Sequence, residues 1–176
     1  MEHDLQNTIA LLSHTPAALD AFLRHLPEIW TERNEGGDSW TVHRVVGHLI
    51  NNERVNWMPR ARWILEFGDS RPFEPFERLA PQSKPLPELL DEFAVVRSQN
   101  LDDLRSMKLQ KEDLTRRGQH SQLGPVTLSE LLATWATHDL THLHQISRIM
   151  ASQYRDTVGP WIQFLGVLHC EGHGAA

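Results

Sequence analysis

Apolar residues return every three to four positions in four long segments of this chain. The segments run from about Asp4 to His25, from Thr41 to Phe67, from Leu86 to Met107, and from Thr127 or Ser129 to Tyr154. Such spacing is typical of helices that bury one face. Between the segments we find neither the alternation of a strand nor an Asn-Gly hairpin turn. The pattern predicts an all-α fold, and a four-helix bundle is its simplest form.

Proline marks the connections and two positions inside the helices. Five prolines fall between Gly68 and Pro87, which predicts a long crossover between helices 2 and 3 that lets neighbouring helices run parallel. A second irregular link is expected over residues 108–126. Pro16 predicts an irregularity in the first helix, and Pro59 predicts a kink in the second.

Further signals lie at the start of the last long helix and near the end of the chain. Glu130 stands three residues after Thr127, which is the spacing of a capping box. A short C-terminal helix is expected from Pro160 to His169. The chain has 176 residues, no internal repeat and no Gly-Ser linker, so a single domain over residues 1–176 is expected.

Composition and charge exclude several functional classes. The formal net charge is −6 and the basic residues are scattered, so no nucleic-acid partner is expected. There is no run of eighteen apolar residues and no signal-peptide pattern, so we expect neither a membrane span nor export. Cys170 is the single cysteine, which excludes an internal disulfide and suits a reducing compartment. A cytoplasmic protein is the resulting expectation.

Two histidines, His138 and His142, lie four residues apart in the last long helix. This spacing places both within the apolar stripe, so both rings are predicted to point into the protein. Buried imidazoles cost free energy unless each finds a hydrogen-bond partner or a metal. The pair alone fits either case, and a further ligand has to decide. His144 falls on roughly the opposite face and is expected to be exposed.

The second helix offers two candidates for that ligand, His43 and His48. His48 lies at the border of the apolar stripe, whereas His43 projects away from it, so His48 is preferred. Three imidazoles and one or more waters make an open site of the kind used for chemistry. Imidazole suits several divalent transition metals, and zinc or nickel is expected before iron or manganese.

Three stretches of the chain carry a family resemblance. They are WTVHRVVGHLINNER from Trp40 to Arg54, RPFEPF from Arg71 to Phe76, and LGPVTLSELLATWATHDLTHLHQI from Leu123 to Ile146. The combination of a GHL histidine with a later HDxxH motif resembles the DinB-like family of bacterial proteins, which includes YfiT-type thiol transferases. The resemblance implies a four-helix bundle, often dimeric, with a divalent metal at one end of the core. Its metal ligands would be His48, His138 and His142.

The resemblance leaves three functions open. A metal could bind a low-molecular-weight thiol, lower its pKa and present the thiolate to an electrophile. It could instead activate water for hydrolysis. Alternatively, the protein could be a non-catalytic binding or stress-related bundle whose three histidines hold a metal only for stability, or bind none in the cell. A general base is scarce, because Glu53 is predicted on the far side of the apolar stripe and Asp139 is expected either to position a neighbouring group or to pair with an arginine. A small-molecule substrate is expected in the first two cases.

Other residues complete the predicted surroundings of the site. The pocket candidates are Asn52, Trp57, Trp135 and Asp139. Three arginines, Arg54, Arg60 and Arg62, could receive an anionic substrate, although charges on a helix usually form a solvated face. Four residues near the C-terminus could form the interface of a homodimer, namely Trp161, Ile162, Phe164 and Leu165. The tail from His169 to His173 has metal-ligand residue types but is not expected to form a second site.

Overall fold

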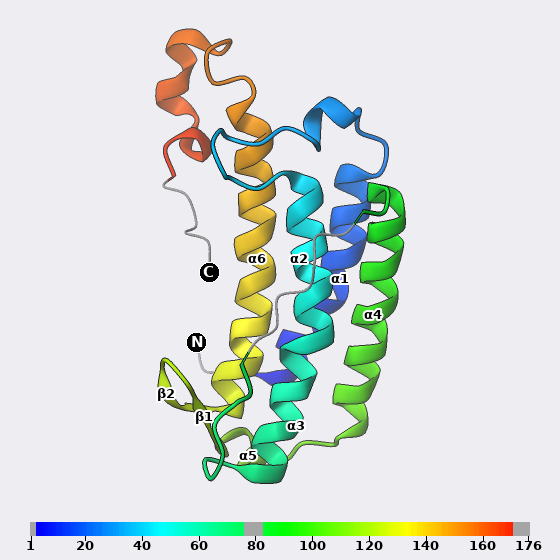
Figure 1. Cartoon of the computed structure of the whole chain (residues 1–176), viewed down its shortest axis with the longest axis vertical. Coiled ribbons are helices and arrows are strands. Elements are labelled where there is room, and N and C mark those ends of the chain that lie inside the picture. Colours follow the sequence, from blue (N-terminus) through cyan, green and yellow to red (C-terminus); the bar gives the residue numbers. More distant parts are fainter. Residues whose placement is uncertain (1–2, 76–82, 171–176) are drawn as a thin grey trace.

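Four long helices lie side by side along the molecule (Figure 1). The structure, a computed structural model, describes residues 3–75 and 83–170. The long helices are α1 (Leu5–Leu23), α2 (Val42–Val55), α4 (Leu86–Ser106) and α6 (Leu128–Ser152), and α3 (Trp57–Phe67) continues the line of α2. The predicted four-helix bundle is therefore confirmed.

The chain direction follows the predicted crossover. In Figure 1, α1 and α6 run upward, whereas α2 with α3 and then α4 run downward. The connection from α3 to α4 returns the chain to the upper end, so α2 and α4 are parallel neighbours. Residues 76–82 of this connection, and with them Phe76 and Pro81, lie outside the described residues.

A polar layer divides the apolar core of the bundle into two clusters. The lower cluster includes Ile9, Leu12, Trp57, Leu101, Leu104, Leu132 and Trp135. The upper cluster includes Leu19, Leu23, Val45, Leu49, Leu89, Phe93, Ile146 and Ile149. Buried polar residues from each long helix, and from the end of α2, fall between the two clusters. We call this set the polar layer. It consists of Thr15, Asn51, Asn52, Glu53, Asn56, Arg97, Asp139, His142 and Gln145. The polar layer brings side chains capable of chemistry into the middle of the bundle.

Pro16 lies inside α1 and leaves one backbone carbonyl without its helical donor. The N–H that Pro16 lacks would have bonded the carbonyl of Leu12, four residues earlier. Arg97 of α4 fills the gap, because its Nη1 donates to that carbonyl at 2.8 Å. At the predicted irregularity of the first helix, the free carbonyl of Leu12 thus connects α1 to α4.

The second predicted helix is divided in two, and the division lies before Pro59 rather than at it. Helix α2 ends at Val55, and Asn56 has φ −109° and ψ −71°. Inside a helix, proline clashes with the carbonyl of the residue four positions earlier, which here is Val55, whereas it is well tolerated in the first turn. The break at Asn56 therefore leaves Pro59 in the first turn of α3.

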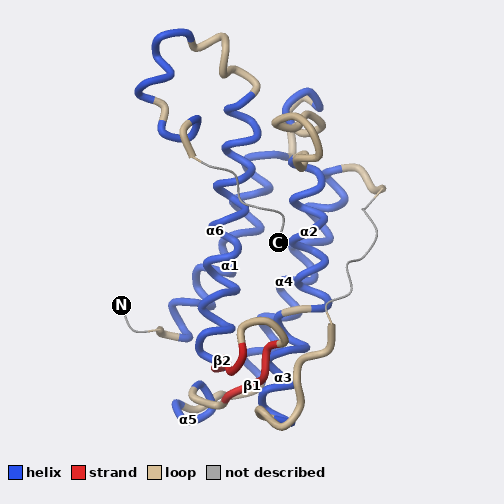
Figure 2. The backbone as a smooth tube through the Cα atoms, turned by 60° about the vertical axis from the view of Figure 1, so that its left-hand side comes forward, coloured by secondary structure: helices blue, strands red, loops and turns tan. Residues whose placement is uncertain are grey.

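The link between α4 and α6 is ordered, and the prediction that the chain has no hairpin was wrong. After the short helix α5 (Lys111–Leu114), strands β1 (Arg117–His120) and β2 (Gly124–Thr127) pair antiparallel beside α3 (Figure 2). The turn has no Asn-Gly signal; instead His120 Nδ1 accepts hydrogen bonds from the N–H groups of Gln122 and Leu123. The hairpin then leads into α6 through the predicted capping box of Thr127 and Glu130.

The segment after α6 forms 3₁₀ turns rather than the single helix expected over residues 160–169. These turns are η2 (Gly159–Phe164) and η3 (Gly166–Leu168), which extend beyond the upper end of α6 (Figure 1). A further turn, η1 (Glu28–Trp30), follows α1. Among the described residues, no helix is both long and apolar enough to cross a membrane.

Candidate metal centre

The three histidines singled out in the sequence meet between α2 and α6. His138 Nε2 lies 3.2 Å from His48 Nε2 and 3.1 Å from His142 Nε2. One ring nitrogen from each residue lies within 4.8 Å of the others, an arrangement that could hold a metal ion. Two nitrogens bound to one tetrahedral zinc at about 2.0–2.1 Å would be about 3.4 Å apart. The two spacings from His138 therefore fit a shared ion.

Gln145 sets the orientation and the tautomer of His142. Its Oε1 lies 2.7 Å from His142 Nδ1. An amide oxygen can only accept, so Nδ1 carries the proton and the lone pair of a neutral His142 is on Nε2, toward the other two rings. A hydrogen bond to the remaining ring nitrogen is the usual support of a metal-binding histidine.

Asn52 supports His48 from the same helix. Its Nδ2 donates to the carbonyl oxygen of His48 at 2.9 Å and lies 3.0 Å from His48 Nε2. Its Oδ1 accepts from Asn56 Nδ2 at 3.0 Å, which fixes which end of the amide faces the histidines. The sequence placed Asn52 among the pocket candidates, and the structure places it at the edge of the centre.

Burial keeps the middle histidine uncharged. Burial, followed by the charges of His142, His48 and Arg97, lowers the pKa of His138 from 6.5 to about 2. A neutral imidazole carries only one ring proton, so hydrogen bonds among the three rings cannot pair every converging nitrogen lone pair. A cation bound between the rings can accept all three. His138 Nδ1 also has no hydrogen-bond partner among the described residues. The donor set suits a transition metal, for which imidazole is a common ligand.

Aromatic rings enclose the centre on two sides. Trp40 lies 4.9 Å from His48 between ring centroids and stacks on His142 at 6.4 Å. Trp57 contacts the His138 ring edge-on at 5.1 Å. Trp135 stacks on Trp57 at 6.0 Å between ring centroids. Sequence reasoning missed Trp40, although its place immediately before the cap of α2 could have suggested it.

Behind these tryptophans lies a network of buried charges. Arg97 of α4 donates to both oxygens of Asp139, at 2.6 and 2.9 Å, and to Glu53 Oε1 at 2.8 Å. Each of the three residues is 1% exposed. Asp139 thus pairs with an arginine, as expected. The prediction that Glu53 lies on the far side of the apolar stripe was wrong, because α2 also buries the face that it turns toward α4.

The remaining acceptors of Glu53 are engaged as well. Trp135 Nε1 donates to Glu53 Oε1 at 2.8 Å, and Asn100 Nδ2 donates to Glu53 Oε2 at 2.9 Å. Sequence reasoning missed Arg97 and Asn100. The available signal was a charged residue inside the otherwise apolar stripe of the third long segment. The two carboxylates nearest the histidines in sequence are therefore held by hydrogen bonds.

The family of the chain follows from its sequence. The profile of the DinB superfamily matches residues 11–146, a range that includes all three histidines. The chain belongs to the DinB superfamily. Residues 11–146 extend from α1 into α6, so the match spans the four long helices.

A solved structure shows the same fold as this DinB-superfamily chain. It is YfiT from Bacillus subtilis, with a TM-score of 0.69, 20% sequence identity, and 87% of each chain covered. That protein is described as a probable metal-dependent hydrolase with an unusual four-helix bundle topology. At this identity the likeness shows the shared fold. Among curated proteins, no match to the chain is found.

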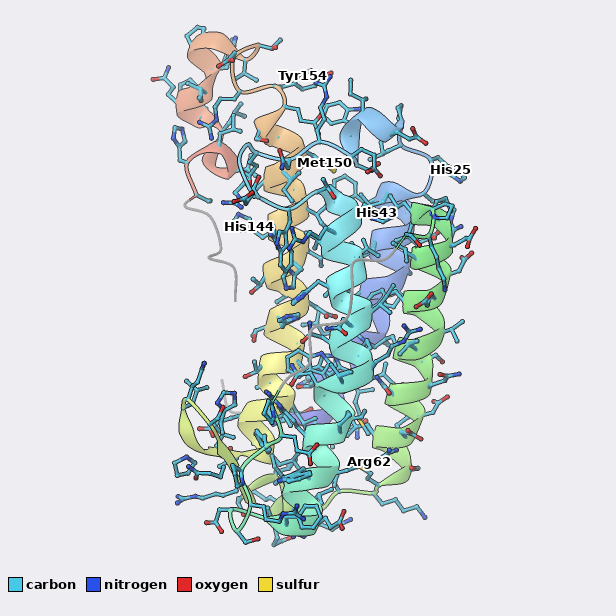
Figure 3. The ribbon with its side chains drawn as sticks, viewed as in Figure 1. His25, His43, Arg62, His144, Met150 and Tyr154 are labelled. Atoms are coloured by element: carbon cyan, nitrogen blue, oxygen red, sulfur yellow. The ribbon has the colours of Figure 1, made fainter. Side chains whose placement is uncertain are left out.

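The other described histidines of this DinB-superfamily protein lie outside the centre. His43 lies at the upper end of α2, and its Nε2 bonds the carbonyl oxygen of Lys84 at 2.7 Å (Figure 3). His144, which was predicted to be exposed, is half-buried on α6. In the tail, His169 Nε2 bonds the carbonyl oxygen of Ile162, and residues 171–176 lie outside the described part of the chain.

The three arginines proposed as anion receptors have other partners. Arg54 pairs with Glu92, and Arg62 pairs with Asp103. Arg60 lies over the ring of Phe73 at 5.1 Å. The arginine beside the histidines is Arg44, one turn before His48, whose guanidinium lies 4.9 Å from the centre of the Trp40 ring.

The predicted dimer surface is partly exposed. Trp161 is 69% and Phe164 is 72% exposed, whereas Ile162 and Leu165 are half-buried. The homodimer itself remains a prediction.

Proposed function

We propose that this DinB-superfamily protein is a divalent-metal-dependent enzyme that transfers a low-molecular-weight thiol to an electrophile. The observation that carries the proposal is the meeting of three imidazole nitrogens from His48, His138 and His142. No described cysteine, aspartate or glutamate joins the group. The three histidines would hold the metal and leave a coordination position for a small molecule, with zinc or nickel as the expected ion.

The state of the neighbouring carboxylates favours a thiol over water as the nucleophile. Hydrolysis commonly relies on a general base that accepts the proton of water. Both oxygens of Asp139 already accept from Arg97, and those of Glu53 accept from Arg97, Trp135 and Asn100. A thiol is far more acidic than water and needs no such base once a nearby positive charge lowers its pKa.

The residues around the centre have separate tasks in this proposal. The metal, when bound, supplies the positive charge that favours the thiolate. Gln145 orients His142, Asn52 offers an amide donor beside His48, and the Trp40 and Trp57 rings keep bulk water away from the sulfur. In the transfer, the sulfur forms a bond to the electrophilic carbon, the leaving group departs with its electron pair, and the thiol proton passes to solvent.

Arg44 suggests that one of the two substrates is an anion. It is exposed, lies one turn from His48 on the same helix, and rests on Trp40, which contacts two of the three histidines. Its guanidinium lies over this ring, and no described carboxylate forms an ion pair with it. An arginine so placed can bind a carboxylate or phosphate through two hydrogen bonds.

A second candidate is metal-dependent hydrolysis. A metal can lower the pKa of water enough to generate hydroxide at neutral pH. The description of YfiT as a probable metal-dependent hydrolase favours testing it.

The test is elemental analysis of the untagged protein beside the His138→Ala variant, followed by activity assays. We expect about one equivalent of a divalent transition metal in the natural chain and none in the variant. The loaded protein should then consume low-molecular-weight thiols, bacillithiol among them, in the presence of 1-chloro-2,4-dinitrobenzene. Hydrolysis of p-nitrophenyl acetate without thiol consumption would favour the hydrolase. Absence of metal after reconstitution would contradict both.

A further inference from the structure

The buried network of Glu53, Arg97 and Asp139 carries an excess of negative charge. Two carboxylates face one guanidinium, so the formal charge of the network is −1. Its other donors, Trp135 Nε1 and Asn100 Nδ2, are neutral. A buried ionised group that lacks a matching opposite charge is costly in a low-dielectric interior. The network therefore calls for a further positive charge nearby.

The other buried cation of the described chain does not supply that charge. Arg148 is the second buried arginine, and it pairs with Glu35 at 2.6 Å. Arg148 also lies beyond the residues of the polar layer, among the upper apolar cluster of α6. The excess charge of the network thus stays unmatched by the buried described side chains.

The histidines lie next to this network. Asp139 directly follows His138 in α6. On the other side, the Trp57 ring touches His138 edge-on and stacks on Trp135, which donates to Glu53. Trp57 is 3% and Trp135 is 0% exposed, so buried aromatic rings rather than water separate the two groups. Charges interact strongly across such a region because it screens them poorly.

We propose that the Glu53–Arg97–Asp139 network is the counter-charge for a divalent cation held by His48, His138 and His142. The three imidazole ligands are neutral, so they do not balance the charge of the cation. The negative charge that balances it comes from the network. Glu53 and Asp139 are then positioning residues that strengthen metal binding without touching the metal. This inference rests on the proposed metal centre, and it adds a second, buried determinant of the affinity.

The test compares Zn²⁺ affinity in the natural chain and in Glu53→Gln, measured by competition with a chromophoric chelator. The variant removes one negative charge and leaves Arg97 paired with Asp139 through two hydrogen bonds. We expect Zn²⁺ binding to weaken about tenfold or more, as is usual when outer partners of a metal site are changed. The midpoint of thermal unfolding of the metal-free variant should equal or exceed that of the natural chain.

Two further variants make the result decisive. Asp139→Asn removes the other negative charge and should also weaken Zn²⁺ binding. Leu104→Ala removes buried apolar volume without changing charge, so it should lower the unfolding midpoint with Zn²⁺ affinity unchanged.

The outcomes separate this inference from the proposed function. If the natural chain binds no Zn²⁺, the metal centre itself is wrong. If it binds Zn²⁺ and both charge variants bind it equally tightly, the centre stands and the counter-charge is wrong. Failure of both variants to fold without metal would also contradict the inference, because the metal-free bundle would then need both carboxylates.

Discussion

Arg97 and Asp139 are joined by two hydrogen bonds in the middle of the bundle, from Nη1 to Oδ2 and from Nη2 to Oδ1. The same guanidinium donates to Glu53 of α2 and to the carbonyl of Leu12 in α1. One side chain of α4 thus contacts each of the other three long helices. The contact therefore links α2 and α6, the two helices that carry the three histidines, through α4.

Replacement of Arg97 by methionine should destabilise the protein strongly. It would leave two buried carboxylates without their cation, a change that typically costs about 3–5 kcal/mol. Urea unfolding followed by circular dichroism measures the loss. The control is Arg62→Met, which breaks the exposed pair with Asp103 and should cost less than about 1 kcal/mol. Equal losses of unfolding free energy in the two variants would show that the buried ion pairs stabilise the protein no more than the exposed pair does.

Gln145→Leu should weaken metal binding while the bundle stays folded. The change removes the acceptor that keeps the proton of His142 on Nδ1. Loss of such a partner typically lowers metal affinity about tenfold or more. Gln145→Glu keeps an acceptor oxygen and should retain the affinity, and Gln163→Leu on the exposed surface is the control. Equal Zn²⁺ affinity in all three variants would rule out this role for Gln145.

Arg44→Gln should raise KM for an anionic substrate and leave kcat and metal content unchanged. Loss of one charge-assisted hydrogen bond of about 1.5 kcal/mol corresponds to about a tenfold change in KM. Steady-state kinetics with a charged and an uncharged electrophile of similar size would measure the effect. Arg54→Gln, on the same helix but paired with Glu92, is the matched control. A similar KM change for both electrophiles would mean that Arg44 does not recognise charge.

Gly118→Ala should destabilise the protein although alanine is compatible with a strand. A Cβ at Gly118 would lie 2.7 Å from Ile64 Cγ1 and 2.9 Å from the Phe73 ring. Such overpacking typically costs about 1–3 kcal/mol. At Gly166 a Cβ would meet nothing within 4 Å, so Gly166→Ala should shift the thermal midpoint little. A stable Gly118→Ala protein would show that the hairpin can move away from α3.

The histidine cluster could be predicted because its geometry is largely local. Four residues of helix place His138 and His142 on one side of α6, and a single facing histidine then completes the group. The four helices were equally visible, because each carries its own apolar periodicity.

The buried network could not be predicted in the same way, because its contacts are made between helices. The partners of Arg97 lie 42, 44 and 85 residues away in sequence. Glu53 was misplaced because a single stripe was assumed for a helix that packs against two neighbours, with His48 turned toward α6 and Glu53 toward α4. The hairpin was missed for a related reason, since packing of Gly118 against Ile64 and Phe73 fixes it.

The polar layer also determines the register of the four helices. An apolar core alone tolerates a slide of one helix along its neighbours, because one leucine can replace another. A slide of α4 by one turn, about 5.4 Å, would carry Arg97 away from both carboxylates and leave three unpaired buried charges. The sequence therefore selects one vertical alignment of the bundle. In that alignment, helices that begin at opposite ends of the molecule present their histidines at the same height.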